Sequence, residues 1–418
     1  MTNPALQTDA YEFSMLDSFV KSGMADKTAV FEAFTRKLPA GRRYGVFAGI
    51  ARFFDALEDF KFSAEDLDTL EGAGFISPET RDWLTDFKFS AQVRYLHEGD
   101  FFYPNTPLVN ITGRLGECVL VETLLLSILN HDSAVASAAS RMRVAAGDRN
   151  LIEMGGRRVQ EDAAVSASRA AYLAGFDATS NVAASKQYEI PLTGTAAHAF
   201  TLAHKTEEEA FANQIKALGT GTTLLVDTYD IEQGIRNAVE VGGPHLGGIR
   251  IDSGDLRDES TKARALLDSL GATDTKIVVS SDLDEFLIAG AGRHVDVFGA
   301  GTRVVTGSGH PTCGMVYKLV AIQDEEDGSF RAVAKKASGK ASVGGSKTPY
   351  RYADGAEGFS LTGEVPEGAE ALFVTGAPAT LHEARAFHTE RMAQAPAEML
   401  KISAGEPYTE AVLDRKEN

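Results

Sequence analysis

The segment Gly248–Asp255 places several reactive side chains directly after a short apolar run. It reads Gly-Ile-Arg-Ile-Asp-Ser-Gly-Asp, so one arginine, two aspartates and a serine stand within six positions. Arg250 could hold a carboxylate or a phosphate through two parallel N–H bonds. Asp252 could accept from ribose hydroxyls or hold a metal through water. The structural alternative is that Asp252 or Ser253 caps the next helix while Arg250 pairs with an acid.

A glycine-rich turn follows another apolar run and reads Phe-Gly-Ala-Gly-Thr at residues 298–302. Small residues let backbone N–H groups approach a phosphate, and the start of a helix favours an anion. One unit earlier, Ser280-Ser281-Asp282 is also small and polar. Such turns also serve as simple packing devices, but two adjacent ones are typical of the phosphate site that barrel enzymes build from late loops.

His198 is the histidine whose position best suits chemistry. It follows the segment 194–197 (Gly-Thr-Ala-Ala) and, before that, the apolar run Tyr188–Leu192, so we expect it at the end of a strand. There it could act as an acid, a base or a nucleophile, although a structural role is the commoner one for a histidine. None of the nine histidines has a spacing such as His-Glu-x-x-His, and two cysteines are too few for a cysteine-based zinc site. We therefore expect no metal site made by the protein alone.

Two further segments carry weaker signals. Gly155-Gly156-Arg157-Arg158 adds positive charge after an apolar run, and a solvated basic face is the structural alternative. Thr8-Asp9-Ala10-Tyr11 predicts the start of a helix capped by Thr8 or Asp9. Periodicity assigns the second segment no function.

The elements that must position these residues repeat between residues 113 and 331. Short apolar runs, typical of parallel strands buried on both faces, end in Gly, Asp, Ser or Thr at intervals of about 20 to 30 residues, the length of a βα unit. Because the carboxyl ends of such strands share one edge, we expect the ligands there. The pattern favours a β/α barrel as the catalytic domain, with an open doubly wound sheet as the alternative. The expected strands are residues 151–154, 223–226, 248–251, 276–279 and 295–298.

Two flanking zones complete the chain. Residues 1–112 are rich in Phe and Tyr and alternate as half-buried strands do, so they predict an α/β domain. Residues 332–418 are too short and polar to form their own core, and we expect them to pack back on the N-terminal domain. Within them, the basic segment 335–347 predicts a mobile loop or hairpin, and residues 380–393 predict a helix capped by Thr380.

Composition restricts the partners and the location. The formal net charge of −18 repels nucleic acid and anionic membranes, so neither is expected as a partner. No apolar run is long enough for a membrane span, and Met1–Asp9 does not resemble a signal peptide. With only two cysteines, we expect a cytoplasmic protein. If the substrates are anions, specific basic side chains must gather locally against the global charge.

Taken together in chain order, these stretches resemble the nicotinate phosphoribosyltransferase family over about residues 8 to 320. One Gly-x-Gly would carry little weight, but an ordered set is specific. The last 85 residues or so match only loosely, and the metal-binding cysteines of archaeal-type relatives are not present. The matching motifs are Thr8-Asp9-x-Tyr11, Arg36-Lys37-Leu38-Pro39, Tyr44-x-Val46-Phe47-Ala48-Gly49, Gly156-Arg157-Arg158, Gly175-Phe176-Asp177-x-Thr179-Ser180-Asn181-Val182-Ala183, Gly194-Thr195-x-Ala197-His198, Arg250-x-Asp252-Ser253-Gly254-Asp255-Leu256, Ser281-Asp282-Leu283-Asp284, Gly299-x-Gly301-Thr302 and Val316-Tyr317-Lys318-Leu319-Val320.

The resemblance implies an irregular β/α barrel beside an open α/β sandwich built from both chain ends. It also implies a homodimer with shared active sites, in which Tyr11 of one chain reaches the barrel of the other and stacks on a pyridine ring. The implied reaction joins nicotinate to phosphoribosyl pyrophosphate, assisted by ATP and Mg²⁺, as the first step of NAD salvage from nicotinate.

The resemblance also implies a role for each matching residue. Arg250 would meet the nicotinate carboxylate with Thr195 beside it, although Arg157, which would line the ring and ribose pocket, also qualifies. Asp252 would hold ribose hydroxyls, and His198 matches the histidine that the family phosphorylates from ATP. The 5′-phosphate would be held by Ser281, Gly301 and Thr302, with added charge from Lys318.

Other functions stay open. Amide-selective relatives carry an aspartate where this chain has Ser180, so a nicotinamide phosphoribosyltransferase is the first alternative and nicotinate is favoured. Quinolinate would demand a denser basic cluster. A non-catalytic phosphosugar-binding protein could lose His198 or Asp252, yet both are present. An aldolase-type barrel would need a Schiff-base lysine at a strand end, and the strand ends above offer none.

Overall fold

A computed structural model of the protein describes residues 3–323, 328–335 and 342–414. The chain divides into two compact units, one formed by residues 1–134 with 312–418 and the other by residues 135–311. Of the basic segment 335–347, the part 336–341 lies outside the described residues. Its last residue, Lys347, is buried and bonded to Glu32 at 2.7 Å, so this end of the segment is fixed.

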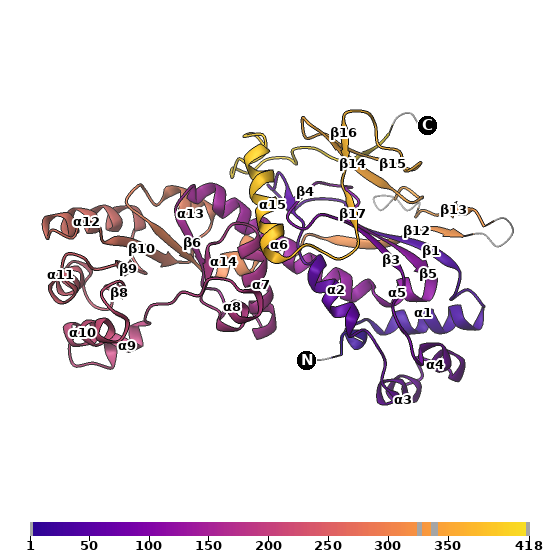
Figure 1. Cartoon of the computed structure of the whole chain (residues 1–418), viewed down its shortest axis with the longest axis horizontal. Helices are drawn as coiled ribbons and strands as arrows, with labels where there is room; N and C mark the ends of the chain where they lie inside the picture. The colour runs from indigo at the N-terminus through magenta and orange to yellow at the C-terminus, as the bar shows by residue number, and fades with distance from the viewer. Residues whose placement is uncertain (1–2, 324–327, 336–341, 415–418) are drawn as a thin grey trace. The chain divides into compact units, whose positions relative to one another are not determined.

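A parallel sheet forms the centre of unit 135–311, with the strand order β7-β6-β11-β10-β9-β8 (Figure 1). The five strands expected at residues 151–154, 223–226, 248–251, 276–279 and 295–298 are all present, displaced by at most two residues, because side chains buried on both faces leave a continuous apolar signature. The strands are β6 (Asn150–Glu153), β7 (Ala178–Thr179), β8 (Thr223–Leu225), β9 (Gly248–Ile251), β10 (Lys276–Ser281) and β11 (Val297–Ala300).

Helices follow most of these strands and cover the sheet, as βα units require. Several begin at an aspartate whose carboxylate accepts backbone N–H groups, namely Asp230, Asp255 and Asp284. In Figure 1, α10 to α12 lie outside strands β8 to β10. The helices of this unit are α7 (Glu161–Leu173), α8 (Val182–Tyr188), α9 (His198–Leu202), α10 (Glu207–Leu218), α11 (Ile231–Gly242), α12 (Leu256–Ser269), α13 (Glu285–Gly290), α14 (Thr302–Val305) and the short 3-10 turn η2 (Gly307–Gly309).

The strand order is cyclic except at one point. Each strand neighbours the next one in the sequence, and β11 returns to pair with β6. Between β7 and β8, however, the described residues form no ladder, so they do not make a closed barrel. The mixed α/β fold is confirmed, and the sheet is open where the chain crosses from β7 to β8.

The expected strand over Tyr188–Leu192 is not formed. Tyr188 ends α8, and this stretch contributes only an isolated parallel bridge between Leu192 and Thr179. Pro191 has no N–H to donate to a ladder, which explains why an apolar run remains irregular here. His198 consequently stands at the start of α9 and not at the end of a strand.

The second unit contains a sheet of order β13-β12-β1-β5-β3-β17, which takes strands from both ends of the chain. Helix α5 packs against β1 and β5 of this sheet, and α1 packs against α5. The strands of this unit are β1 (Thr28–Thr35), β2 (Gly45–Val46), β3 (Gln92–Leu96), β4 (Phe101–Phe102), β5 (Val109–Arg114), β12 (Met315–Gln323), β13 (Phe330–Ala332), β14 (Thr348–Tyr352), β15 (Glu357–Ser360), β16 (Ala369–Ala371), β17 (Phe373–Thr375) and β18 (Val412–Leu413). The helices are η1 (Pro4–Leu6), α1 (Ala10–Lys21), α2 (Ile50–Glu58), α3 (Ala64–Gly72), α4 (Pro78–Leu84), α5 (Leu115–Leu120), α6 (Glu122–Ala146), which runs past residue 134, and α15 (Leu381–Gln394).

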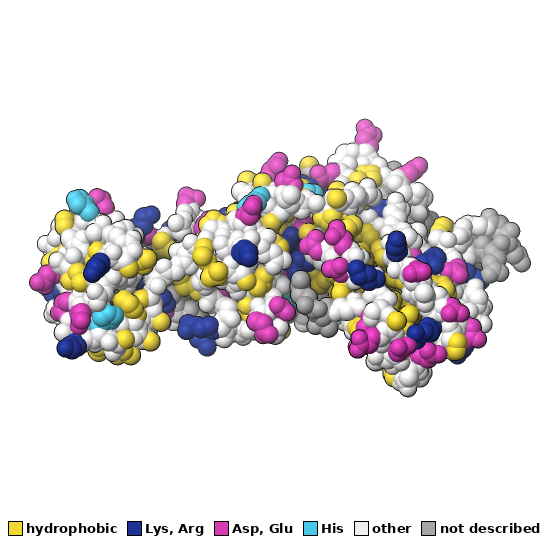
Figure 2. Space-filling model, turned by 60° about the horizontal axis from the view of Figure 1, so that its bottom comes forward, with side chains coloured by type: hydrophobic (Ala, Val, Ile, Leu, Met, Phe, Trp, Pro, Cys, Tyr) yellow, Lys and Arg dark blue, Asp and Glu magenta, His cyan; other side chains and the backbone are white. Residues whose placement is uncertain are grey.

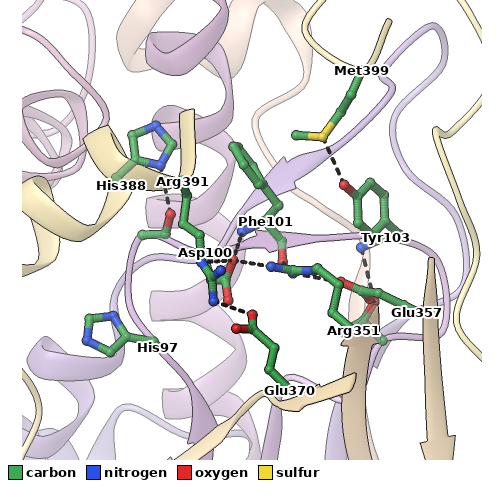
Figure 3. A network of polar contacts seen from close by, with 12 residues as sticks. His97, Asp100, Phe101, Tyr103, Arg351, Glu357, Glu370, His388, Arg391 and Met399 are labelled. Atoms are coloured by element: carbon green, nitrogen blue, oxygen red, sulfur yellow. Dashed lines mark hydrogen bonds and ion pairs between the residues drawn. The ribbon is translucent and has the colours of Figure 1, made fainter. Parts of the chain in front are cut away.

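Charged side chains attach the C-terminal segment to the N-terminal part of this unit (Figure 3). Buried Arg351 donates to the carboxylate of Asp100 at 2.7 Å and to that of Glu357 at 2.7 and 2.9 Å. On α15, Arg391 lies 3.5 Å from Asp100, and His388 lies 2.7 Å from the carbonyl oxygen of Gly99. A buried charge is stable only when it is paired, so these contacts fix the position of β14, β15 and α15.

The apolar core of this unit is large and aromatic, and it includes both cysteines, which are unpaired and buried. Within the described part of the chain, no helix is both long and apolar enough to cross a membrane. Acidic and basic side chains are interspersed over the face drawn in Figure 2.

Candidate active site

The expected site residues of unit 135–311 leave the sheet at its carboxyl edge. In the parallel register, Ile251 lies beside Val279, Ser281 beside Ala300, and Glu153 beside both Ala300 and Thr179. The residues that follow these positions therefore emerge at the same edge of the sheet. They are Asp252 after β9, Ser281 at the end of β10, Gly301 and Thr302 after β11, Arg157 in the turn after β6 and Ser180 after β7.

Arg250 is held by partners on three sides. Its Nε donates to the hydroxyl of Ser280 at 2.7 Å, one terminal nitrogen to Thr195 Oγ1 at 3.2 Å, and the other to Asp252 Oδ1 at 3.2 Å. Ser280 also donates to Asp252. The guanidinium is mostly buried, with 15% of the side chain exposed, so its orientation is set by the protein. Arg250 and Asp252 thus meet Thr195, which lies 55 residues before Arg250, in one cluster.

His198 is joined to the same cluster through Asp227. Its Nε2 lies 3.0 Å from Asp227 Oδ1, and the other oxygen of Asp227 accepts from the backbone N–H of Asp252 at 2.9 Å and from Ser253 Oγ at 2.7 Å. Asp227 is almost fully buried, with 1% of its side chain exposed, whereas 41% of the His198 side chain is exposed. A buried carboxylate on one ring nitrogen orients the imidazole and leaves the other nitrogen facing outward.

The structure decides against the capping role for Asp252 and Ser253. Helix α12 is capped by Asp255, whose side chain accepts from the backbone N–H groups of Arg257 and Asp258. The carboxylate of Asp252 contacts Arg250 and Ser280 instead, and Ser253 contacts Asp227. Arg250 does pair with an acid, as the structural alternative held, but that acid belongs to the same edge.

The two small polar turns are adjacent. Ser281 is exposed at the end of β10, and Gly301 and Thr302 follow its neighbour β11. Arg303 and Asp282 form an ion pair at 3.4 Å that links the turns. Gly155 must be a glycine, because a Cβ there would lie 2.3 Å from Val305 and 2.8 Å from the carbonyl oxygen of Gly301. The turn after β6 therefore packs directly against the turn after β11.

Tyr11 and Lys318 belong to the other unit, and both lie near Glu122. Burial, followed by the carboxylate of Glu122, raises the pKa of Tyr11 to about 12, so the phenol stays neutral, while the ring remains 44% exposed. Lys318 Nζ lies 3.7 Å from Glu122 and donates to the carbonyl oxygen of Tyr317 at 2.6 Å. Lys318 is thus paired within that unit, while the Tyr11 ring stays partly exposed.

Among the described residues, no group of three or more His, Cys, Asp or Glu side chains could hold a metal ion. The edge offers the carboxylate of Asp252, which is 32% exposed, whereas Asp227 is buried with both oxygens hydrogen-bonded. Mg²⁺ is often bound by one or two carboxylates together with substrate phosphates and waters. The donor set fits an ion that arrives with a phosphorylated substrate.

Sequence reasoning assigned no role to Asp227 or Glu153, and it named Ser280 only as part of a small polar segment. Asp227 follows β8 after one residue, Val226, so the strand-end rule that selected Asp252 applies to it as well. Ser280 lies inside β10 and Glu153 inside β6, where a polar residue among apolar ones was the available signal.

Comparisons with known proteins identify the family of the chain. The family model of the nicotinate phosphoribosyltransferase N-terminal domain matches residues 6–130. A Mycobacterium tuberculosis protein named nicotinate phosphoribosyltransferase pncB1 is 47% identical, over 96% of this chain and 93% of its own length. The Bacillus subtilis nicotinate phosphoribosyltransferase is 39% identical, over 83% of this chain and 73% of its own length.

Solved structures show the same fold. The human nicotinic acid phosphoribosyltransferase aligns with a TM-score of 0.83 and 26% identity, covering 98% of each chain. A nicotinate-nucleotide pyrophosphorylase from Pyrococcus furiosus aligns with a TM-score of 0.76 at 22% identity, over 94% of this chain and 96% of that one, which is a likeness of fold alone. Given nearly full-length identity of 47% and the residues joined at the sheet edge, the chain belongs to the nicotinate phosphoribosyltransferase family.

Proposed function

We propose that the protein transfers phosphoribose from phosphoribosyl pyrophosphate to nicotinate, giving nicotinate mononucleotide and pyrophosphate in the first step of NAD salvage from nicotinate. One observation carries the proposal: a continuous hydrogen-bonded cluster joins His198, Asp227, Asp252, Arg250 and Thr195 at one sheet edge of a family member. The cluster combines a histidine that can couple ATP to the reaction, a carboxylate that can bind ribose and an oriented guanidinium that can bind an aromatic acid.

The nicotinate carboxylate would bind Arg250 and Thr195. One terminal nitrogen of Arg250 lies 3.2 Å from the Thr195 hydroxyl, so a carboxylate can replace this contact and accept from both donors. Arg157 is exposed in the turn after β6 and would line the ring pocket. Ser180 carries no charge, so it does not repel an acid as an aspartate would.

Phosphoribosyl pyrophosphate would lie along the neighbouring turns. Asp252 would accept from the ribose hydroxyls, and Ser281, Gly301 and Thr302 would donate to the 5′-phosphate. Lys318 would add positive charge. Bound Mg²⁺ would stabilise negative charge on the pyrophosphate oxygens, with Asp252 as the carboxylate within reach.

The pyridine nitrogen attacks the anomeric carbon as its bond to the pyrophosphate oxygen breaks, and the electron pair of that bond leaves with pyrophosphate. A pyridine nitrogen is already a nucleophile, so no strong general base is needed. The residues of the edge therefore act by holding both reactants in line and by compensating the developing charge.

ATP would act through His198. The free imidazole nitrogen attacks the γ-phosphorus of ATP, ADP leaves, and water later releases phosphate from the phosphohistidine. Because Asp227 contacts Nε2 at 3.0 Å, we propose Nδ1 as the nitrogen that is phosphorylated. Phosphohistidine at His198 would couple ATP hydrolysis to tighter substrate binding and to a favourable equilibrium.

We extend the proposal to the arrangement of the strands and to the assembly of the subunits. We propose that the cyclic strand order is an irregular, incompletely closed β/α barrel and that the unit with both chain ends is the open sandwich. We propose a cytoplasmic homodimer in which exposed Tyr11 of one chain stacks on the pyridine ring bound by the other. The buried, unpaired cysteines are compatible with a reducing compartment.

The purified protein should form nicotinate mononucleotide and an equal amount of pyrophosphate from nicotinate, phosphoribosyl pyrophosphate and Mg²⁺, faster when ATP is added. Its kcat/KM for nicotinate should exceed that for nicotinamide. Higher kcat/KM for the amide would assign the first alternative, and substrate binding without pyrophosphate release would assign a phosphosugar-binding protein.

A further inference from the structure

Glu153 is a buried carboxylate that no step of the proposed reaction uses. It is the last residue of β6, the strand between β7 and β11, and it is 1% exposed. Its side chain lies beneath the two turns that carry Arg157 and Ser180. A buried carboxylate costs free energy unless its oxygens are hydrogen-bonded, so its partners indicate what it does.

Both oxygens of Glu153 are used, and they serve different turns. Oε1 accepts the backbone N–H of Gly155, two residues further along the chain. Oε2 accepts from the hydroxyls of Thr179 on β7 at 2.7 Å and of Ser168 on α7 at 2.8 Å. One carboxylate thus connects the end of β6 with the end of β7.

Gly155 and Thr179 each accept a further hydrogen bond that spans a proposed substrate-binding residue. The carbonyl oxygen of Gly155 accepts from the N–H of Arg158 at 2.8 Å, and Arg157 lies between them. The hydroxyl of Thr179 accepts from the N–H of Asn181 at 3.0 Å, and Ser180 lies between them. The positions of Arg157 and Ser180 are therefore both tied to the same buried side chain.

We propose that Glu153 is a positioning residue for the pyridine pocket: it fixes the turns that present Arg157 and Ser180 to nicotinate. This inference rests on the function proposed above. An ionised carboxylate suits the task because it only accepts, and the N–H and the two hydroxyls all donate to it. Contacts that hold a substrate-binding turn in place matter because small displacements of a binding group reduce turnover strongly.

Glu153→Gln tests the proposal, because glutamine places an NH₂ donor opposite the hydroxyls and keeps the side-chain size. We expect the KM for nicotinate to rise about tenfold, with the KM for phosphoribosyl pyrophosphate within about twofold of wild type. A purely structural role would lower the yield of active protein, and hence kcat, without this selective change in KM.

Thr179 gives a second test that does not alter the carboxylate. Thr179→Val removes the hydroxyl and should raise the KM for nicotinate in the same way, whereas Thr179→Ser keeps it and should restore the wild-type value. This pair decides the question if Glu153→Gln does not fold.

Glu285→Gln is the matched control. Glu285 is 2% exposed and also joins separate elements of this unit, since at the start of α13 it accepts from Ser308 of η2 at 2.8 Å and from Arg141 of α6 at 3.0 Å. These two partners lie in neither turn of the pyridine pocket, so the KM of Glu285→Gln for nicotinate should stay within about twofold of the wild-type value. Equal effects of Glu153→Gln on both substrates, an unchanged nicotinate KM, or a failure of Thr179→Ser to restore it would overturn the inference. An inactive wild-type protein would instead refute the proposed function.

Discussion

Asp227 connects the two chemical parts of the site. One of its oxygens binds His198, and the other binds the backbone and side chain of the turn Asp252–Ser253. Any movement of the imidazole is therefore transmitted to the turn proposed to hold ribose. This contact offers a physical route by which a phosphate on His198 could change substrate affinity at a site only one carboxylate away.

His198→Ala should abolish the stimulation of turnover by ATP, because no nitrogen remains to accept the γ-phosphate. Slow transfer without ATP should persist, since Arg250 and Asp252 are still in place. Steady-state rates with and without ATP measure this directly. Full ATP-coupled turnover in the variant would show that His198 is not the phosphorylated group.

Asp227→Asn is the companion variant, because an amide can donate to Nε2 and favour the wrong imidazole tautomer. Phosphorylation of His198 from labelled ATP should slow at least about tenfold. The residual ATP-independent transfer should change less. Equal loss of both rates would mean that Asp227 acts on folding alone.

Much of the site could be predicted from single residues, and some of it could not. His198, Arg250 and Asp252 carry distinctive chemistry at strand-end or motif positions, and they do meet. Asp227 and Glu153 were not selected. A carboxylate just after a strand is usually a helix cap, as Asp255 is, and a single carboxylate at the end of the run of β6 carries no signal of its partners. Only the contacts made across strands distinguish the two uses.

At the scale of elements, α11 packs unusually close to β8. A Cβ on Gly234 of α11 would lie 2.2 Å from the carbonyl oxygen of Val226, which directly precedes Asp227. Backbone cannot move away as a flexible side chain can. The glycine is therefore required for the position of Asp227.

Gly234→Ala should lower the free energy of unfolding by about 1–3 kcal/mol through overpacking, although alanine in a helix is normally favoured over glycine by about 1 kcal/mol. Denaturant unfolding measures the change. Gly290→Ala, at the end of α13 where nothing lies within 4 Å, is the control and should be neutral or stabilising. Stabilisation by Gly234→Ala would contradict the close approach.

Helix α15 is attached through a histidine that burial keeps neutral. Burial lowers the pKa of His388 to about 4, and its ring lies 2.7 Å from the carbonyl oxygen of Gly99 (Figure 3). Between the ordinary pKa of about 6.5 and this value, the unfolded chain binds a proton here and the folded chain does not. The free energy of unfolding must therefore fall as the pH falls through this window.

His388→Asn keeps a donor for Gly99 but does not titrate. Between pH 7 and pH 4, the free energy of unfolding of His388→Asn should fall by about 3 kcal/mol less than that of the wild-type protein. Denaturant unfolding at several pH values gives the two slopes. His245→Asn, at an exposed position, should follow wild type, and parallel slopes for His388→Asn would show that His388 does not control this pH dependence.

Many strands and helices could be predicted, above all the strands whose side chains are buried on both faces of the sheet. Strand β9 forms over the expected residues 248–251, and α15 begins after Thr380, whose capping box with Glu383 is visible in the sequence. Strand β7 spans only two residues, too short for a periodic signal. The open point between β7 and β8 depends on pairing, which no local pattern specifies.

At the scale of the whole molecule, a chain of charge −18 must bind two anions. Its field opposes them, so affinity must come from donors held at short range, such as Arg250 and the backbone of the Gly301 turn. The mixed surface charges in Figure 2 fit this local solution. In the proposed homodimer, Tyr11 would add an uncharged ring face to this site.

Mixing Tyr11→Ala with Arg250→Ala tests whether sites are shared between subunits. Each variant alone should be nearly inactive. After unfolding and refolding together in equal amounts, half of the dimers are mixed and each contains one intact site, so about a quarter of wild-type activity should return. No recovery, despite mixed dimers being detected, would place Tyr11 and Arg250 in sites of the same chain or outside the site.

A crystal structure with nicotinate and a non-reacting analogue of phosphoribosyl pyrophosphate tests directly whether both substrates bind at the sheet edge that holds Arg250 and His198. The account predicts the carboxylate between Arg250 and Thr195, the ribose hydroxyls on Asp252, and the 5′-phosphate on Ser281, Gly301 and Thr302. Nicotinate bound away from the edge that holds Arg250 and His198, or a phosphate bound away from the Gly301 turn, would contradict it.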